Sequence, residues 1–173
     1  MSKILKIKQI GYDELEILLS MYREKAEWLN RIGQPMWSME YLEKQNFITK
    51  YDYPDCFVAY INDIPIGGFI LLESDKLFWG TDDHLAVYYI HKLVVTHDYT
   101  GQGNAEKMLG WIEEYAKTNG KEAVRLDCYE DRKYLLQLYK SCGFNLVEVK
   151  VMPDGTRIAQ FEKRLQSKDG RTG

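Results

Sequence analysis

With 173 residues, the chain has about one domain's length, and its hydrophobic (45%) and charged (28%) fractions are those of an ordinary globular protein. Its net charge of −3 provides no basic surface for a phosphate backbone, so no nucleic-acid partner is expected. No apolar run approaches the ~20 residues that span a bilayer, and the N-terminal stretch MSKILKIKQIGYDE lacks the apolar core of a signal peptide, so no membrane association is expected.

The first half of the chain predicts two helices, a hairpin and a long strand. Apolar side chains recur at helical spacing in YDELEILLSMYREKAEWLN, residues 12–30, and a second, weaker helix is expected after Ser38 as its N-cap. Two strand-like runs in residues 56–74 meet at Asn62-Asp63, a typical hairpin turn. LFWGTDDH, residues 77–84, is expected to be a loop, and LAVYYIHKLVV, residues 85–95, a strand.

The second half predicts a helix from Ala105 that stops at Asn119-Gly120, a strand over residues 123–129, and a helix closed by Gly143. Two strands follow, over residues 144–152 and 157–165, around the turn PDG. The hairpins favour antiparallel pairing, and the strand-helix-strand from Leu85 to Tyr129 favours a parallel crossover. The fold class is therefore α/β (α+β) with a mixed sheet. We expect one domain over residues 1–165 and a polar C-terminal tail over 166–173.

The stretch LVVTHDYTGQGNAEKMLGW, residues 93–111, joins a buried strand to a helix through a turn with two glycines. A helix N-terminus has unpaired N–H groups and a partial positive charge, and glycines let a ligand approach the backbone. The stretch can therefore hold a phosphate. On a simpler interpretation, Gly101 and Gly103 only provide the positive φ of a tight turn.

Three phosphate-binding interpretations compete for this turn. A P-loop requires Gly-Lys-Ser/Thr at its end, which is absent here. A dinucleotide fingerprint requires a small residue where Glu106 stands, although Asp127 could take the place of the ribose-binding acid. A nucleotide-dependent oxidoreductase thus stays an alternative, but the motif follows an antiparallel hairpin, where that fold would not place it.

The third interpretation is a resemblance. Residues 93–105 resemble motif A of the GNAT superfamily of N-acetyltransferases, in which a Leu-x-Val strand end precedes Gln/Arg-x-x-Gly-x-Gly/Ala; Thr100 replaces the Gln/Arg. DRKYLLQLYKSCGF, residues 131–144, resembles motif B, which ends in Tyr-x-x-x-Gly-Phe, with Arg132 where the family often has Asn. The resemblance covers nearly the whole chain. It implies a GNAT-like, mostly antiparallel twisted sheet of about seven strands flanked by about four helices.

The resemblance implies acyl transfer from acetyl-CoA, as co-substrate, to a primary amine of a small molecule or peptide. The turn would hold the cofactor's pyrophosphate, and a strand end that splays from its neighbour would polarise the thioester carbonyl with free N–H groups. The expected cofactor-binding residues are Leu93, Val94, Val95, Thr100, Gly101, Gln102, Gly103, Asn104, Ala105, Glu106 and Arg132.

Tyr139 occupies the family position whose hydroxyl protonates the leaving thiolate. An amine attacks only when neutral, so a general base is needed. Asp127 falls at a carboxylate position used by some members, and His91, with an unperturbed pKa near 6.5, is the second candidate. The acceptor is expected near the early helices and the loop before the long strand, at an aromatic wall, with Glu27 or Asp83 to attract an ammonium. The candidates for this wall are Trp28, Trp37, Trp79 and Tyr89.

A catalytically silent acyl-CoA-binding or sensing module on the same fold is the alternative, because Thr100 and Arg132 depart from the family pattern. Three cysteines, Cys56, Cys128 and Cys142, include no CxxC and are expected to be reduced, in a cytoplasm; we interpret Cys128 and Cys142 as small core residues. No metal is expected. The sequence does not identify the acceptor and leaves a homodimer open.

Overall fold

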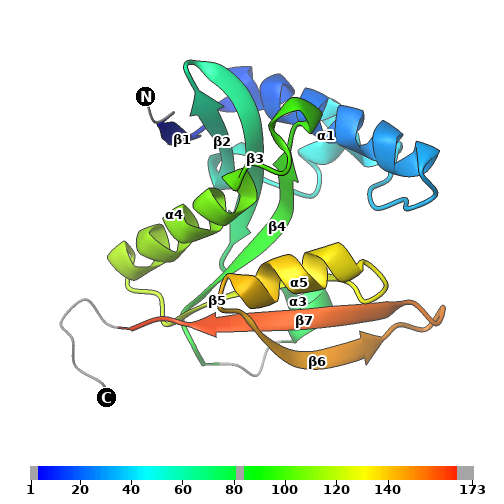
Figure 1. Cartoon of the computed structure of the whole chain (residues 1–173), viewed down its shortest axis with the longest axis vertical. Helices are drawn as coiled ribbons and strands as arrows, with labels where there is room; N and C mark the ends of the chain where they lie inside the picture. Colours follow the sequence, from blue (N-terminus) through cyan, green and yellow to red (C-terminus); the bar gives the residue numbers. More distant parts are fainter. Residues whose placement is uncertain (1–3, 81–83, 167–173) are drawn as a thin grey trace. The chain divides into compact units, whose positions relative to one another are not determined.

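The computed structural model describes residues 4–80 and 84–166, and a seven-stranded mixed sheet organises them (Figure 1). The strands are β1 (Leu5–Gln9), β2 (Cys56–Ile61), β3 (Ile64–Leu72), β4 (Val87–Val95), β5 (Ala123–Tyr129), β6 (Asn145–Val151) and β7 (Arg157–Arg164), in the order β1-β2-β3-β4-β5-β7-β6. The helices are α1 (Leu15–Arg31), α2 (Lys44–Phe47), α3 (Lys76–Trp79), α4 (Asn104–Thr118) and α5 (Lys133–Ser141). This architecture confirms the predicted fold class.

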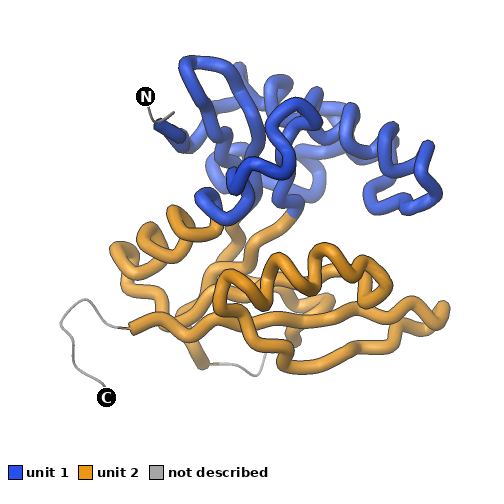
Figure 2. Tube along the Cα trace, in the orientation of Figure 1, with its two compact units in different colours: residues 1–70, 92–108 blue, residues 71–91, 109–173 orange. Residues whose placement is uncertain are grey.

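The chain divides into two compact units, which Figure 2 shows in different colours. Unit 1 comprises the described parts of residues 1–70 and 92–108, and unit 2 those of 71–91 and 109–173. The chain passes between them within β3, β4 and α4, so each of these elements contributes to both units. None of the helices in the described ranges is long and apolar enough to cross a bilayer.

Unit 1 packs the apolar face of α1 against a small antiparallel sheet. β1 pairs with β2, and β2 pairs with β3 through the predicted hairpin. Asn62 (φ 50°) and Asp63 (φ 65°) form its turn, since Asn and Asp tolerate left-handed backbone. Gly67 on β3 has no room for a side chain, because a Cβ there would lie 2.3 Å from the carbonyl oxygen of Val94. The apolar face of α1 is fully or almost fully buried at Leu15, Leu18, Leu19, Tyr22, Ala26 and Leu29.

Unit 2 contains the parallel pairing that the sequence predicts. β4 pairs with β5 from Val87↔Ala123 to Ile90↔Leu126, while β5–β7 and β7–β6 are antiparallel. β7 lies between β5 and β6, so its Ile158–Phe161 segment is buried on both faces, whereas β6 is the outer strand and is mostly exposed. The helix α5, shown in yellow in Figure 1, contributes Tyr139 to the core of this unit.

Two local predictions were wrong. The helix expected after Ser38 is a short 3-10 helix, η2 (Met39–Leu42), followed by the one-turn α2, because Glu43 between them has extended backbone; the Ser38 side chain makes no cap hydrogen bond. The expected loop after β3 contains the one-turn helix α3, since Asp75 Oδ1 accepts from the backbone N–H of Phe78 at 3.2 Å. Asp83 lies outside the described residues.

Candidate functional site

The start of α4 in unit 1 is the predicted phosphate turn. Gly101 (φ 70°) and Gly103 (φ 81°) both have left-handed backbone, so both glycines provide the positive φ that the tight-turn interpretation requires. The first hydrogen bond of the helix runs from Lys107 N to Gly103 O at 3.1 Å. The N–H groups of residues 104–106, in the first turn, therefore have no acceptor within the helix. A Cβ on Gly101 would meet no atom within 4 Å, and one on Gly103 only a Glu106 carboxylate oxygen at 4.0 Å. The backbone is therefore open to a ligand.

Three side chains of the predicted cofactor set hold this turn in place. The Thr100 hydroxyl, the Gln102 amide and the Asn104 amide each donate to a carbonyl of the preceding 3-10 helix η4 (His97–Tyr99), at 2.8, 2.9 and 2.9 Å. Asn104 is buried and Glu106 is exposed. The side chains thus fix the shape of the turn, and the backbone N–H groups supply its positive end.

The segment of β4 that enters unit 1 is irregular. Lys92 has left-handed backbone (φ 51°), which is uncommon for a residue other than glycine. Burial, with a smaller effect of Lys50, lowers the Lys92 pKa to about 8, and its ammonium lies 5.3 Å from the Trp37 ring centroid. The β4–β5 ladder ends at Ile90↔Leu126, two residues before Lys92, although β4 continues to Val95. This irregular strand end carries the predicted carbonyl-binding residues Leu93–Val95.

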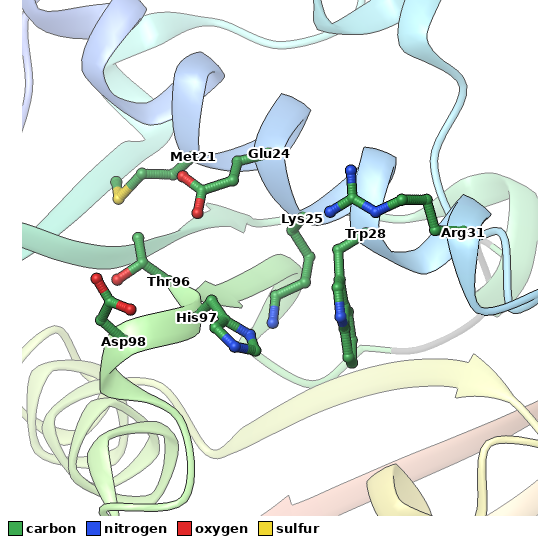
Figure 3. Close-up of a pocket in the computed structure, with 8 residues that line it drawn as sticks. All are labelled: Met21, Glu24, Lys25, Trp28, Arg31, Thr96, His97 and Asp98. Carbon is green, nitrogen blue, oxygen red and sulfur yellow. The ribbon is translucent and has the colours of Figure 1, made fainter.

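A cavity of about 260 Å³ lies in unit 1 between α1 and the segment that follows β4 (Figure 3). It is lined by Met21, Glu24, Lys25, Trp28, Arg31, Thr96, His97 and Asp98. The Trp28 ring lies 6.0 Å from the His97 ring and 5.0 Å from the Lys25 ammonium. Trp28 is therefore the predicted wall residue that borders this cavity. Glu27 is exposed and is not among the lining residues.

Both base candidates belong to one polar cluster in unit 2. His91 Nε2 lies 3.1 Å from Oδ2 of Asp75, whose side chain is only 6% exposed. Burial, the largest cause, raises the pKa of Asp127 to about 6; the electrostatic interaction with His91 lowers it, the Asp75 carboxylate raises it, and the neighbouring Trp79 indole lowers it. Asp127 is thus a carboxylate that is charged at pH 7 but more basic than an ordinary aspartate.

A buried arginine supports the strands that carry these candidates. Arg125 pairs with Glu162 at 2.7 Å, donates to the Tyr89 hydroxyl at 3.0 Å, and lies 4.8 Å from the Trp79 ring centroid. Gln160, opposite Asp127 on β7, is buried and donates to the carbonyl of Phe78 beside Trp79. The predicted wall residues Trp79 and Tyr89 therefore pack around Arg125, with Tyr89 buried.

Tyr139, the predicted acid, is buried in unit 2 against the rings of Phe144 and Phe161. Burial, with smaller effects of nearby acidic groups, raises the pKa of its hydroxyl well above 10, so the proton stays on the oxygen. Arg132 is also buried and pairs with Asp131 at 2.6 Å. It occupies the N-cap position of α5, but its side chain makes no cap hydrogen bond.

Sequence reasoning missed several residues that the structure brings together. Asp75 and Arg125 were overlooked, although a charged residue in an apolar strand such as AVRLDCY is a signal in itself. The charged cavity residues of α1 follow its helical spacing, but a sequence does not show which segment covers that face. Cys56 and Cys128 are buried, and burial raises the pKa of each to about 12, as expected for inert thiols; Cys142 is half-buried.

The family model of the Acetyltransferase (GNAT) family matches residues 22–144. The uncharacterized N-acetyltransferase YesJ of Bacillus subtilis (strain 168) is 26% identical over 161 residues, 89% of this chain and 87% of that protein. A GNAT-family acetyltransferase from Listeria monocytogenes 4b F2365 has a similar fold, with a TM-score of 0.71 and 19% identity over 95% of this chain and all of its own. The paia N-acetyltransferase of Thermoplasma acidophilum, in complex with coenzyme A, gives a TM-score of 0.65 and 18% identity over 92% of this chain and 98% of its own. Because the family model spans more than half of the residues, the chain belongs to the Acetyltransferase (GNAT) family.

Proposed function

We propose that this protein transfers an acetyl group from acetyl-CoA to a primary amine of a small molecule or peptide. The observation that carries the proposal is the start of α4, where two glycines with positive φ leave the first-turn N–H groups open to a phosphate. The family supports an acetyl donor, and the crystal structure of the Thermoplasma acidophilum protein of similar fold contains coenzyme A. Bound acetyl-CoA would supply the activated acetyl thioester.

Asp127 is the proposed general base. Its buried carboxylate, with a pKa of about 6, is charged at neutral pH and accepts a proton from the acceptor ammonium directly or through a water. His91 lies in the same polar cluster and is the second candidate. Asp75 contacts His91 and holds its ring, because its own carboxylate is fixed at the start of α3.

Tyr139 is the proposed acid. Its raised pKa keeps the hydroxyl protonated at working pH, so it can donate to the departing sulfur. One C–N bond forms and one C–S bond breaks. The ammonium loses one proton to Asp127 before it attacks and a second as the amide forms; the second replaces the proton that Tyr139 gives to the thiolate, and Asp127 releases the first to solvent. This assignment predicts that chemistry depends on both groups of unit 2, while cofactor affinity depends on the turn of unit 1.

A thermal-shift comparison with acetyl-CoA, NAD and NADP, followed by a thiol-release assay with an amine panel, tests the proposal. A ligand that binds only the native state raises stability, so acetyl-CoA alone should raise the melting temperature. Thiol release should then depend on an amine. Stabilisation by NAD or NADP instead would indicate an oxidoreductase. Stabilisation by acetyl-CoA without turnover on any amine would indicate a silent acyl-CoA-binding module.

A further inference from the structure

The cavity of unit 1 is lined by four charged side chains, of which Lys25 lies over the Trp28 ring and interacts electrostatically with Glu24. Glu24, Lys25 and Arg31 come from one face of α1, and Asp98 comes from η4. Within residues 4–80 and 84–166, none of these four side chains forms a hydrogen bond or an ion pair. In contrast, Arg23 on the same helix is paired with Glu16. Glu24, Arg31 and Asp98 are exposed and Lys25 is half-buried, so these charges are accessible to a charged ligand that enters the cavity.

The charges are separated by sign along the cavity. Figure 3 shows Glu24 and Asp98 toward the end where Met21 and Thr96 lie, and Trp28 and Arg31 toward the other end, with Lys25 and His97 between them. Opposite charges at opposite ends match a molecule with a positive group and a negative group. The Trp28 ring supplies an apolar surface between the two ends.

We propose that this cavity recognises the acceptor, and that the acceptor is a small zwitterion of the amino-acid type, whose carboxylate binds Lys25 and Arg31 and whose ammonium is attracted by Glu24 and Asp98 before it loses its proton to the proposed base. The inference rests on the proposed acetyl transfer and narrows its acceptor class. The volume of about 260 Å³ lies below the ~300–1,000 Å³ of sites for drug-sized ligands, which favours a small molecule.

Two further observations support this orientation. Thr96, at the acidic end, directly follows Val95, the last residue of the strand end that is predicted to bind the thioester carbonyl. The bound ammonium would therefore lie close to that strand end. Burial lowers the pKa of the Lys25 ammonium, and a bound carboxylate would offset that desolvation cost. A polycation, such as a polyamine or an aminoglycoside, would instead place positive charge against Lys25 and Arg31 and be repelled.

The experiment begins with the wild-type protein saturated with CoA. Calorimetric titration with each of the proteinogenic amino acids identifies the tightest binder, and its carboxamide, its decarboxylated amine and spermidine are then compared. Thiol release from acetyl-CoA is measured with the same compounds. We expect one or more amino acids to bind, and the neutralised or decarboxylated analogues to lose at least tenfold in both affinity and kcat/KM.

Variants then locate the effect. Arg31→Gln and Lys25→Gln should each weaken binding of the amino acid at least fivefold. Binding of the carboxamide should change little, because this analogue has no carboxylate for the two cations to bind. Lys6→Gln, which removes an exposed lysine of β1 outside the cavity, is the matched control and should change neither compound. Thermal melts of every variant show that the fold is retained, and the comparison of compounds on the wild type needs no variant at all.

Several results would overturn the inference. Equal affinity for the amino acid and its decarboxylated amine, a preference for spermidine, or no binding of any amino acid would each do so. Loss of CoA affinity rather than acceptor affinity in Arg31→Gln would assign the cavity to the cofactor's phosphates. Turnover of non-zwitterionic amines would leave the proposed acetyl transfer intact and refute only this acceptor class, whereas failure of every amine would contradict the proposed function itself.

Discussion

Replacing Asp127 by asparagine should lower activity and raise stability at neutral pH. The substitution keeps the size of the side chain and removes the charge that burial disfavours. In the folded protein the pKa of Asp127 is raised from 3.8 to about 6, so the folded state holds a proton that the unfolded state releases between these values. The buried charge therefore costs no stability below pH 3.8, costs progressively more as the pH rises, and costs its full amount above about pH 6.

The size of this effect follows from the shift. A shift of about 2 pKa units corresponds to about 3 kcal/mol at 1.36 kcal/mol per unit, so Asp127→Asn should gain up to about 3 kcal/mol at pH 7.5. For a chain of this length, about 2–4 °C per kcal/mol gives a melting temperature about 6–12 °C higher. At pH 5 the gain should fall to about half. The same substitution, Asp127→Asn, should lower kcat near neutral pH by roughly 10²-fold.

Urea unfolding at pH 7.5 and pH 5 measures the stability, and thiol release from acetyl-CoA measures kcat. Asp154→Asn is the matched control: this exposed turn carboxylate accepts from Thr156 N at 2.9 Å, which lowers its pKa, so its removal should not stabilise the protein. The reasoning fails if Asp127→Asn is less stable than the wild type at pH 7.5, or if a gain does not shrink at pH 5. Wild-type turnover would remove Asp127 from the mechanism and make His91→Gln the next variant to measure.

Three further variants test other parts of the account. Tyr139→Phe should lower kcat and kcat/KM together with little change in the Kd for acetyl-CoA; a rise in KM for acetyl-CoA at constant kcat would instead make the hydroxyl a binding group. Gly103→Ala should weaken acetyl-CoA binding at least tenfold, about 1.4 kcal/mol, in calorimetric titration. Its control is Gly155→Ala, in a hairpin turn with equally left-handed backbone (φ 89°), which should cost similar stability but leave the affinity for acetyl-CoA unchanged. Arg125→Gln should destabilise unit 2 by about 2–3 kcal/mol in urea unfolding, because the partly buried Glu162 loses one of its two arginine partners; an unchanged midpoint would contradict this role.

The elements that the sequence predicts well are those whose local chemistry determines their structure. The strand over residues 123–129 and the turn at Asn62-Asp63 follow from β-branched residues and from turn residues that tolerate positive φ. The helix α4 begins and ends where glycines and an apolar stripe indicate. In each case, the residues that determine the element lie within it, so no knowledge of tertiary contacts is needed.

The remaining features depend on contacts between distant residues. The strand order places β7 between β5 and β6, which no local pattern indicates. The acidity of Asp127 depends on burial and on Asp75, which is 52 residues away in sequence. The cavity requires η4 to lie beside one face of α1, and only the folded chain shows which charges remain unpaired there. Sequence motifs therefore indicated the turn that we propose for the cofactor and the candidate base, but not the residues that tune or complete them.

The central claim, acetyl transfer to an amine, is tested most directly by measuring both products of one reaction. The wild-type protein is incubated with acetyl-CoA and an amine panel that includes amino acids, and CoA thiol and acetylated amine are quantified in the same samples. We predict that thiol and acetylated amine form in equal amounts with at least one amine, and that Asp127→Asn slows both equally. Thiol release without any acetylated amine, or no thiol release although acetyl-CoA stabilises the protein, would contradict the account.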